Sequence, residues 1–262
     1  MLRITSTILL LLALAGCAGG DSDSETTAGN SPAADVALTA TDLDRFLAVV
    51  QHHSQDTMPE FTPLENEESL DFDQPAGELV DATRRQCRQL FDARRQGALW
   101  ERDAKWKEAF AGQKISGERF ALLVRSVSLA IMRVRLDARI DVTRLVTEAN
   151  RQVEQIAAVM DEIDSVPSGE RSRDDVEVRT RSALRLARAA ALLEFAELVQ
   201  KVPPGSAAMA RRYSKQLKPL LPSLGSDDLL AELSALATGE SSDVEPAGYD
   251  RSARKPAPRA RQ

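Results

Sequence analysis

Apolar residues recur at steps of three and four over most of the chain between residues 41 and 239. This spacing places them on one face of an α-helix. Apolar and polar residues alternate in the manner of a strand only at 176–180, and no second such stretch offers it a partner. The pattern therefore predicts an all-α domain over residues 41–239.

The longest helical pattern covers about 117–164, because neither glycine nor proline occurs between Gly117 and Pro167. The mean spacing of its apolar seam is about 3.5 residues, which is the period of a coiled coil. We predict one long coiled-coil-like helix here. It is expected to pack antiparallel against helices at 76–111 and 173–202 in an elongated bundle.

The second half of this seam has less apolar cover than the first, because a second apolar stripe accompanies only the first half. The next helix along the chain also begins with few large apolar residues. We therefore predict that a hairpin at about 145–185 projects from the bundle. Its seam residues Val153, Ile156 and Met160 would then be available to a partner protein or to a second copy of the chain. The alternative is that the segment 56–75 covers them.

Shorter elements are expected before the long helix. A first helix runs over about 41–55, with Thr41 and Asp44 in the spacing of an N-terminal cap. An acidic connector at 56–75 follows, with three prolines and seven acidic residues. Apolar side chains can anchor this connector on the body, and they are Met58, Phe61, Leu64, Leu70 and Phe72.

Glycine and serine residues suggest further helix ends. Within the helix predicted at 76–111, Gly97 is a candidate kink and Gly112 a candidate end. Serines can cap two short helices, which we expect at about 206–217 and 226–239.

The beginning of the chain has a different pattern. Arg3 precedes a mostly apolar stretch that is too short to span a bilayer, which needs about 20 residues. Leu14, Ala15, Gly16 and Cys17 stand at its end. A charged start, a short apolar middle and a boundary of small residues are typical of a secretory signal.

The tetrad 14–17 resembles the lipobox of bacterial lipoprotein precursors at all four positions, and the resemblance covers only residues 1–18. It implies that residues 1–16 are a signal peptide, cut before Cys17, and that acyl chains on Cys17 anchor the protein in the cell envelope. Ala18 stands where inner-membrane lipoproteins often carry aspartate. This favours an outer-membrane anchor facing the periplasm. The alternative is ordinary signal cleavage without lipid.

The chain has a net charge of −6, and its charged residues are distributed unevenly along the sequence. Residues 17–40 are mostly small or acidic, so we expect a lipidated flexible tether. Residues 240–262 are expected to form a disordered tail, with five basic residues and no acidic residue from 251 onward. Acids and bases are equal in number over 76–250. Nucleic-acid binding needs clustered lysine and arginine, so we expect no nucleic-acid partner.

The two histidines and the second cysteine are candidates for metal binding or catalysis. His52 and His53 are adjacent and lie about 100° apart on a helix, whereas helical metal ligands are spaced by three or four residues. Cys87 falls on the apolar side of its helix, where a thiol is usually a small core residue. A nucleophile–base pair of Cys87 with either histidine is the alternative. We predict neither a metal nor a cofactor.

Paired carboxylates occur at 174–175 and 227–228, each in the first turn of a predicted helix. The helix dipole favours acids there, so we interpret both pairs as caps rather than catalytic groups. Ser252 and Lys255 have the spacing of a Ser–Lys pair but lie in the tail. We do not expect them to form a site.

Trp100 and Trp106 stand among basic residues and could offer a stacking platform for bases or sugars. Six residues apart on one helix, their rings would point to different sides. Packing at the edge of the core is therefore the expected use.

Together these features predict a membrane-anchored envelope lipoprotein. Its helical domain is expected to bind another macromolecule or to have a structural role, without catalysis. The expected partners are the membrane, through Cys17, and an envelope protein or a second copy. Two alternatives remain: a small enzyme that uses Cys87 or a carboxylate pair, and a carrier of an apolar ligand.

Overall fold

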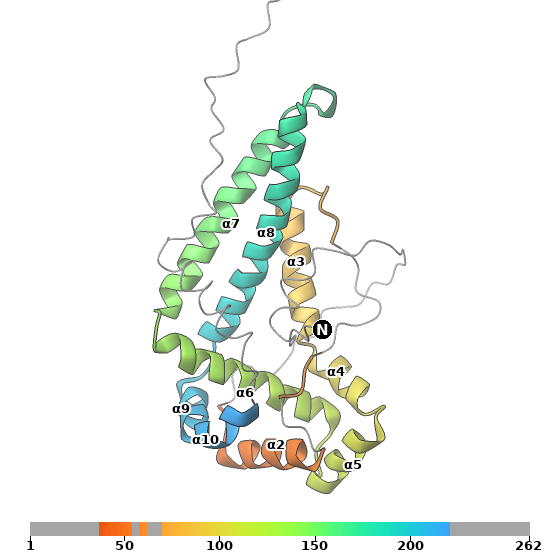
Figure 1. Ribbon diagram of the computed structural model, residues 1–262, viewed down its shortest axis with the longest axis vertical. Coiled ribbons are helices and arrows are strands. Elements are labelled where there is room, and N and C mark those ends of the chain that lie inside the picture. Colours follow the sequence, from red (N-terminus) through yellow and green to blue (C-terminus); the bar gives the residue numbers. More distant parts are fainter. Residues whose placement is uncertain (1–36, 54–57, 62–69, 221–262) are drawn as a thin grey trace, which may run out of the picture.

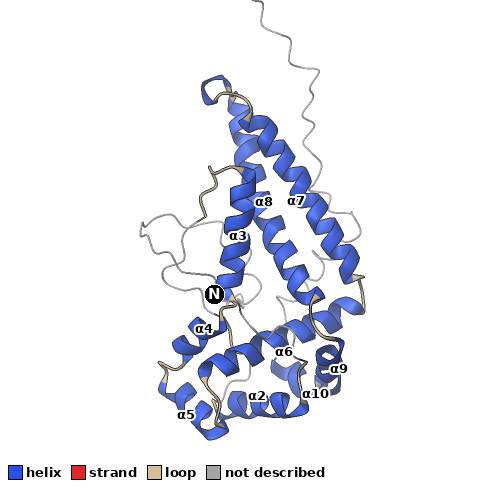
Figure 2. Cartoon of the chain, turned by 180° about the vertical axis from the view of Figure 1, so that it is seen from behind, coloured by secondary structure: helices blue, strands red, loops and turns tan. Residues whose placement is uncertain are grey.

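The described part of the chain is helical and contains no strand, which confirms the predicted all-α class (Figure 2). The computed structural model describes residues 37–53, 58–61 and 70–220. Its α-helices are α2 (Ala40–His52), α3 (Ala76–Leu90), α4 (Ala93–Trp100), α5 (Ala104–Gln113), α6 (Gly117–Asp137), α7 (Val142–Asp164), α8 (Arg173–Gln200), α9 (Pro204–Arg212) and α10 (Ser214–Leu217).

Several predictions fall outside the described residues. These are the signal peptide at 1–16, Cys17, the tether up to residue 36, Leu64 of the connector, the helix at 226–239 with its acidic pair at 227–228, and the tail at 240–262 with Ser252 and Lys255.

The helices form a broad base and a narrower shaft (Figure 1). α7 and α8 are an antiparallel pair that rises from the base, and α3 packs along α8. α6 runs across the foot of this pair, with α2, α4, α5, α9 and α10 around it. Each part has its own apolar core. We call them the base core, around Phe46, Trp106 and Phe120, and the shaft core, around Leu145, Met160 and Leu186.

The single helix predicted at about 117–164 is wrong, because α6 ends at Asp137 and α7 begins at Val142. Asp141 has an extended backbone, and its carboxylate accepts a hydrogen bond from the Thr143 N–H at 2.8 Å. Aspartate is a strong N-terminal cap and can start a new helix without help from glycine or proline. The break lets α7 turn away from α6 and pack on α8 (Figure 1).

The helix predicted at 76–111 is also wrong, because the chain forms α3, α4 and α5 there. Asp92 and Asp103 cap α4 and α5 by accepting hydrogen bonds from backbone N–H groups. Gly112 lies inside α5, which ends one residue later with Lys114 in the left-handed conformation.

Gly97 was a candidate kink, but in the structure it allows α4 and α6 to touch. A Cβ atom at this position would lie 2.2 Å from the backbone nitrogen of Glu118. α4 and α6 therefore cross with their backbones in contact, and only glycine fits between them.

The first helix starts earlier than predicted. Thr39 caps α2 in a capping box with Asp42, so Thr41 and Asp44 do not form the cap. Leu38 is buried, and its N–H donates a hydrogen bond to the Ser206 hydroxyl at 2.9 Å. The prediction of a flexible tether up to residue 40 is therefore wrong for its last residues. Ser206 does not cap a helix, because α9 begins at Pro204.

The helix predicted at 173–202 is confirmed as α8, which Ser172 and Asp175 open with a capping box. The described parts of the connector lie on the body, as predicted. Met58 and Phe61 are buried in the base core. Leu70 and Phe72 pack against the shaft core.

Candidate functional site

The predicted interface residues are buried within the chain. Val153, Ile156 and Met160 are 7%, 8% and 0% exposed, and all three belong to the shaft core. Small or branched side chains of α8 share this core, together with Leu70 and Phe72 of the connector. The prediction that this part of the seam is available to a partner is therefore wrong. The alternative, in which the connector covers the shaft, holds in part: Leu70 and Phe72 pack against the shaft core, whereas Phe61 belongs to the base core. The α8 residues concerned include Ala183, Leu186, Ala187 and Ala190.

Arg179 of α8 explains how the connector is held there. Its buried guanidinium donates hydrogen bonds to the carbonyl oxygens of Phe72, Asp73 and Gln74. It also bonds to the Asp164 carboxylate at the end of α7, at 3.0 Å. One side chain thus joins the connector to both helices of the shaft. Nothing in the apolar pattern indicates this role.

The two tryptophans meet inside the base core. Trp100 belongs to α4 and Trp106 to α5, and their ring centroids are 5.8 Å apart in a stacked arrangement. Both side chains are buried, and both rings contact Phe120 of α6. The expectation that they point to different sides is wrong, because the chain breaks between them. Their use in core packing is confirmed.

His53 lies against this aromatic group. Its ring stacks on Trp106 with centroids 3.9 Å apart, and neither ring nitrogen has a hydrogen-bond partner among the described residues. Burial lowers the pKa of His53 below its ordinary value of 6.5. Asp103 opposes this shift, while Lys105 and His52 add to it. The folded chain therefore favours the neutral form of the His53 ring more than the unfolded chain does.

The stability of the fold should consequently fall as the pH drops below 6.5. The unfolded chain binds a proton at His53 more readily than the folded chain, so acid favours unfolding. We expect the free energy of unfolding, measured with urea and circular dichroism, to decrease from about pH 7.5 to about pH 5.5. His53→Phe keeps the stack and should reduce this slope. His52→Phe, at the exposed neighbour, is the control, and an unchanged slope in His53→Phe would contradict the assignment.

The other groups considered for catalysis are used structurally. Cys87 is buried in the base core, as predicted for a small core residue. The Asp175 carboxylate accepts a hydrogen bond from the Ser172 N–H, and the Asp175 N–H donates one to the Ser172 hydroxyl, so Asp175 of the pair 174–175 acts in the cap of α8.

Sequence reasoning missed an ion-pair cluster between α3 and α8. The Glu194 side chain of α8 is 6% exposed, and its carboxylate pairs with the Arg84 guanidinium at 2.7 Å and with that of Arg88 at 2.9 Å. Burial alone would raise the pKa of Glu194, but the hydrogen bonds from Arg88 and Arg84 hold it below its ordinary value of 4.5. A signal was present, since Glu194 is the one charged residue in the run 189–196.

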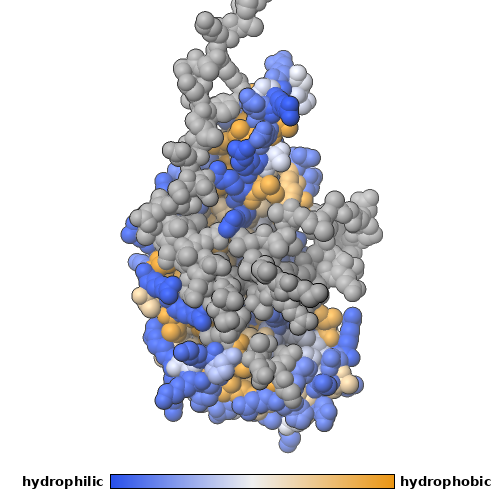
Figure 3. All heavy atoms as spheres, in the orientation of Figure 1, coloured by the Kyte–Doolittle hydropathy of each residue, from blue (hydrophilic) through white to orange (hydrophobic). Residues whose placement is uncertain are grey.

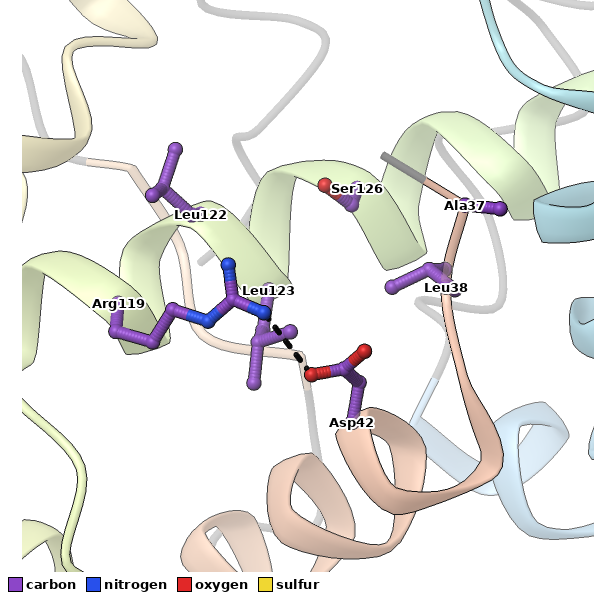
Figure 4. A pocket seen from close by; sticks show the side chains of 7 residues that line it. All are labelled: Ala37, Leu38, Asp42, Arg119, Leu122, Leu123 and Ser126. Atoms are coloured by element: carbon purple, nitrogen blue, oxygen red, sulfur yellow. Dashed lines mark hydrogen bonds and ion pairs between the residues drawn. The ribbon is translucent and has the colours of Figure 1, made fainter. Parts of the chain in front are cut away.

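The described surface has a shallow hollow between α2 and α6 (Figure 4). Arg119 reaches across it and donates a hydrogen bond to Asp42 at 3.1 Å. Burial would raise the pKa of Asp42, but hydrogen bonds from Thr39 and the charge of Arg119 outweigh it and lower the pKa. The hollow has a volume of about 280 Å³, and part of this volume is open solvent. Its other lining residues are Ala37, Leu38, Leu122, Leu123 and Ser126.

The Arg119 guanidinium is the group in this hollow that can bind an anion. The Asp42 carboxylate already accepts bonds from the Thr39 N–H and hydroxyl as well as from Arg119. It is therefore engaged in the cap and in the ion pair. The hollow supports a weak polar contact rather than a reaction.

The described part of the chain holds no group of three or more histidine, cysteine, aspartate or glutamate side chains that could bind a metal ion. No helix in the described ranges combines the length and the apolar character needed to cross a bilayer. Comparison with family models, curated proteins and solved structures finds no match to this chain.

Proposed function

We propose that this chain is a bacterial lipoprotein, held in the cell envelope by acyl chains on Cys17. The lipobox-like tetrad 14–17, at the end of a charged and then apolar stretch, carries this proposal. Two or three acyl chains anchor a protein stably, whereas one chain is marginal. Ala18 favours the outer membrane, with the body in the periplasm.

The body in this proposal binds another macromolecule or has a structural role, and does not catalyse a reaction. The burial of Cys87 and the capping role of Asp175 support this, because neither group is presented to a substrate. The hollow at Asp42 and Arg119 contains a charged pair, which is poorly suited to an apolar ligand. The projecting shaft offers exposed apolar side chains instead: Val176 is 53% and Leu184 39% exposed on α8. An envelope protein or a second copy is the proposed partner.

The anchor is tested by changing Cys17. We expect the wild-type chain, produced in a bacterial host and isolated from its membranes, to lack residues 1–16 and to carry acyl chains by intact-mass analysis. Cys17→Ala should move the chain to the soluble fraction. Cys87→Ala is the matched control and should stay with the membranes, because Cys87 is buried in the core. A wild-type chain with an unacylated N-terminus in the soluble fraction would show that the proposal is wrong.

A further inference from the structure

One corner of the base carries a cluster of exposed basic side chains. Between residues 198 and 220 the chain has five basic residues and no acidic residue. All five are exposed, and they lie at the end of α8, on α9 and α10, and in the 3-10 turn Lys218–Leu220. Figure 3 shows mainly hydrophilic side chains at the lower left of the molecule, where Figure 1 places α9 and α10. We call this surface the basic corner; its residues are Lys201, Arg211, Arg212, Lys215 and Lys218.

The fold separates these charges from the core. Arg211, Lys215 and Lys218 follow at steps of four and three on the outer side of the α9–α10 segment. Its inner side is buried and apolar. Arg211 pairs with Asp137 at 3.3 Å, and none of the other four forms an ion pair with a described residue. Asp44 also lies at this surface, because it accepts a hydrogen bond from the Tyr213 hydroxyl at 2.9 Å. The basic corner still carries more basic than acidic side chains. The buried residues of the inner side are Ala207, Ala210, Leu217 and Leu220.

The segment that leads back to Cys17 leaves the body beside this corner. The Leu38 N–H donates to Ser206 near the start of α9, and Ala37 lies beside Gly205, where an added Cβ would be 3.4 Å from that of Ala37. α9 is about 13 Å long by its nine residues, so its basic end is close to the exit point. Only 19 residues separate Cys17 from Ala37.

We propose that the basic corner docks on anionic phospholipid at the surface of the membrane that holds Cys17. The proposal rests on the lipid anchor proposed above. Lysine and arginine near an anionic membrane are attracted to its surface potential, and a short link raises the effective concentration of the corner at the bilayer. The free end of the α7–α8 pair lies at the far end of the molecule from α9 and α10 (Figure 1). Docking therefore directs the shaft away from the bilayer, toward other envelope components.

The test uses residues 17–262, carrying Cys17→Ser so that no acyl chain contributes. We expect this protein to sediment with vesicles of phosphatidylcholine containing about 30% phosphatidylglycerol, and not with pure phosphatidylcholine. Raising the salt from about 0.1 M to about 0.5 M NaCl should abolish binding, because surface charges are then screened. The combined variant Arg212→Gln, Lys215→Gln and Lys218→Gln should bind at least about tenfold more weakly.

A matched variant removes three exposed basic residues elsewhere: Arg94→Gln on α4, Lys107→Gln on α5 and Arg173→Gln on α8. We expect it to retain binding within about twofold. A third variant changes the five basic residues of 251–262 to glutamine and separates the tail from the corner. Circular dichroism verifies that each variant is folded.

Three results would overturn the proposal: no binding to phosphatidylglycerol vesicles, equal losses in the corner and matched variants, or complete loss in the tail variant with none in the corner variant. Because this protein carries no lipid, the outcome does not depend on acylation. Failure of the lipid anchor would appear only in the mass of the wild-type chain at Cys17.

Discussion

Changing Val153, Ile156 and Met160 together to serine is expected to destroy most of the stability of the folded chain. All three side chains are buried in the shaft core between α7 and α8. Each change removes apolar area from the core and leaves a hydroxyl there, at a cost of about 2–5 kcal/mol per site. The loss approaches the whole free energy of unfolding of an ordinary domain. We expect the melting temperature, measured by circular dichroism, to fall by about 15 °C or more, or the cooperative transition to disappear.

The control for this experiment is Gln155→Ser, an exposed position on the same helix. It should change the melting temperature by only a degree or two, as surface substitutions usually do. If the triple variant melted like the wild type and lost only self-association, α7 would have to present these side chains to a partner, and the description of the shaft core would be wrong.

Glu194→Ala is expected to destabilise the fold by about 2–4 kcal/mol, the second largest effect. The change leaves the Arg84 and Arg88 guanidinium groups beside an apolar helix without their shared carboxylate. Arg88 can turn to solvent, whereas Arg84 is also held by Glu197 at 2.7 Å. Urea unfolding at neutral pH measures the loss.

Glu197→Ala is the comparison, because Glu197 is more exposed and bonds only to Arg84 among the described residues. We expect it to cost less than about 1 kcal/mol. The difference between the two losses in the free energy of unfolding should diminish as the pH falls toward and below 4.5. The pKa of Glu194 is lowered in the fold, so Glu194 stabilises the fold only while its carboxylate is charged. Equal effects of the two substitutions would contradict a special role for Glu194.

The helical class and the full length of α8 could be predicted because an uninterrupted apolar period is a strong signal. The breaks at Asp92, Asp103 and Asp141 were missed because they contain neither glycine nor proline. Within a helical pattern an aspartate resembles any other polar residue on the outer face. Its capping role becomes visible only when the backbone is extended at that position.

The prediction that Val153, Ile156 and Met160 form an interface is wrong for a related reason. The spacing of apolar residues identifies which side of α7 is apolar, but not which segment of the chain covers that side. The Arg179 contacts that hold the connector on the shaft join residues more than 100 positions apart in the chain. Such contacts follow from the topology, which the order of apolar residues does not determine. Cys87 was placed correctly because its prediction needed only its own helix.

The hydrogen bond from the Leu38 N–H to the Ser206 hydroxyl joins residues that are 168 positions apart in the sequence. Two further bonds link the same ends, from the Tyr213 hydroxyl to Asp44 and from the Met58 N–H to the Leu220 carbonyl. Loop-closure entropy opposes such distant pairings, so we expect them to form late in folding, whereas α7 and α8 are sequence neighbours and are expected to pair early. In the export proposed above, α2 crosses the membrane before α9 and α10, so the packing of the base can be completed only after α9 and α10 have followed.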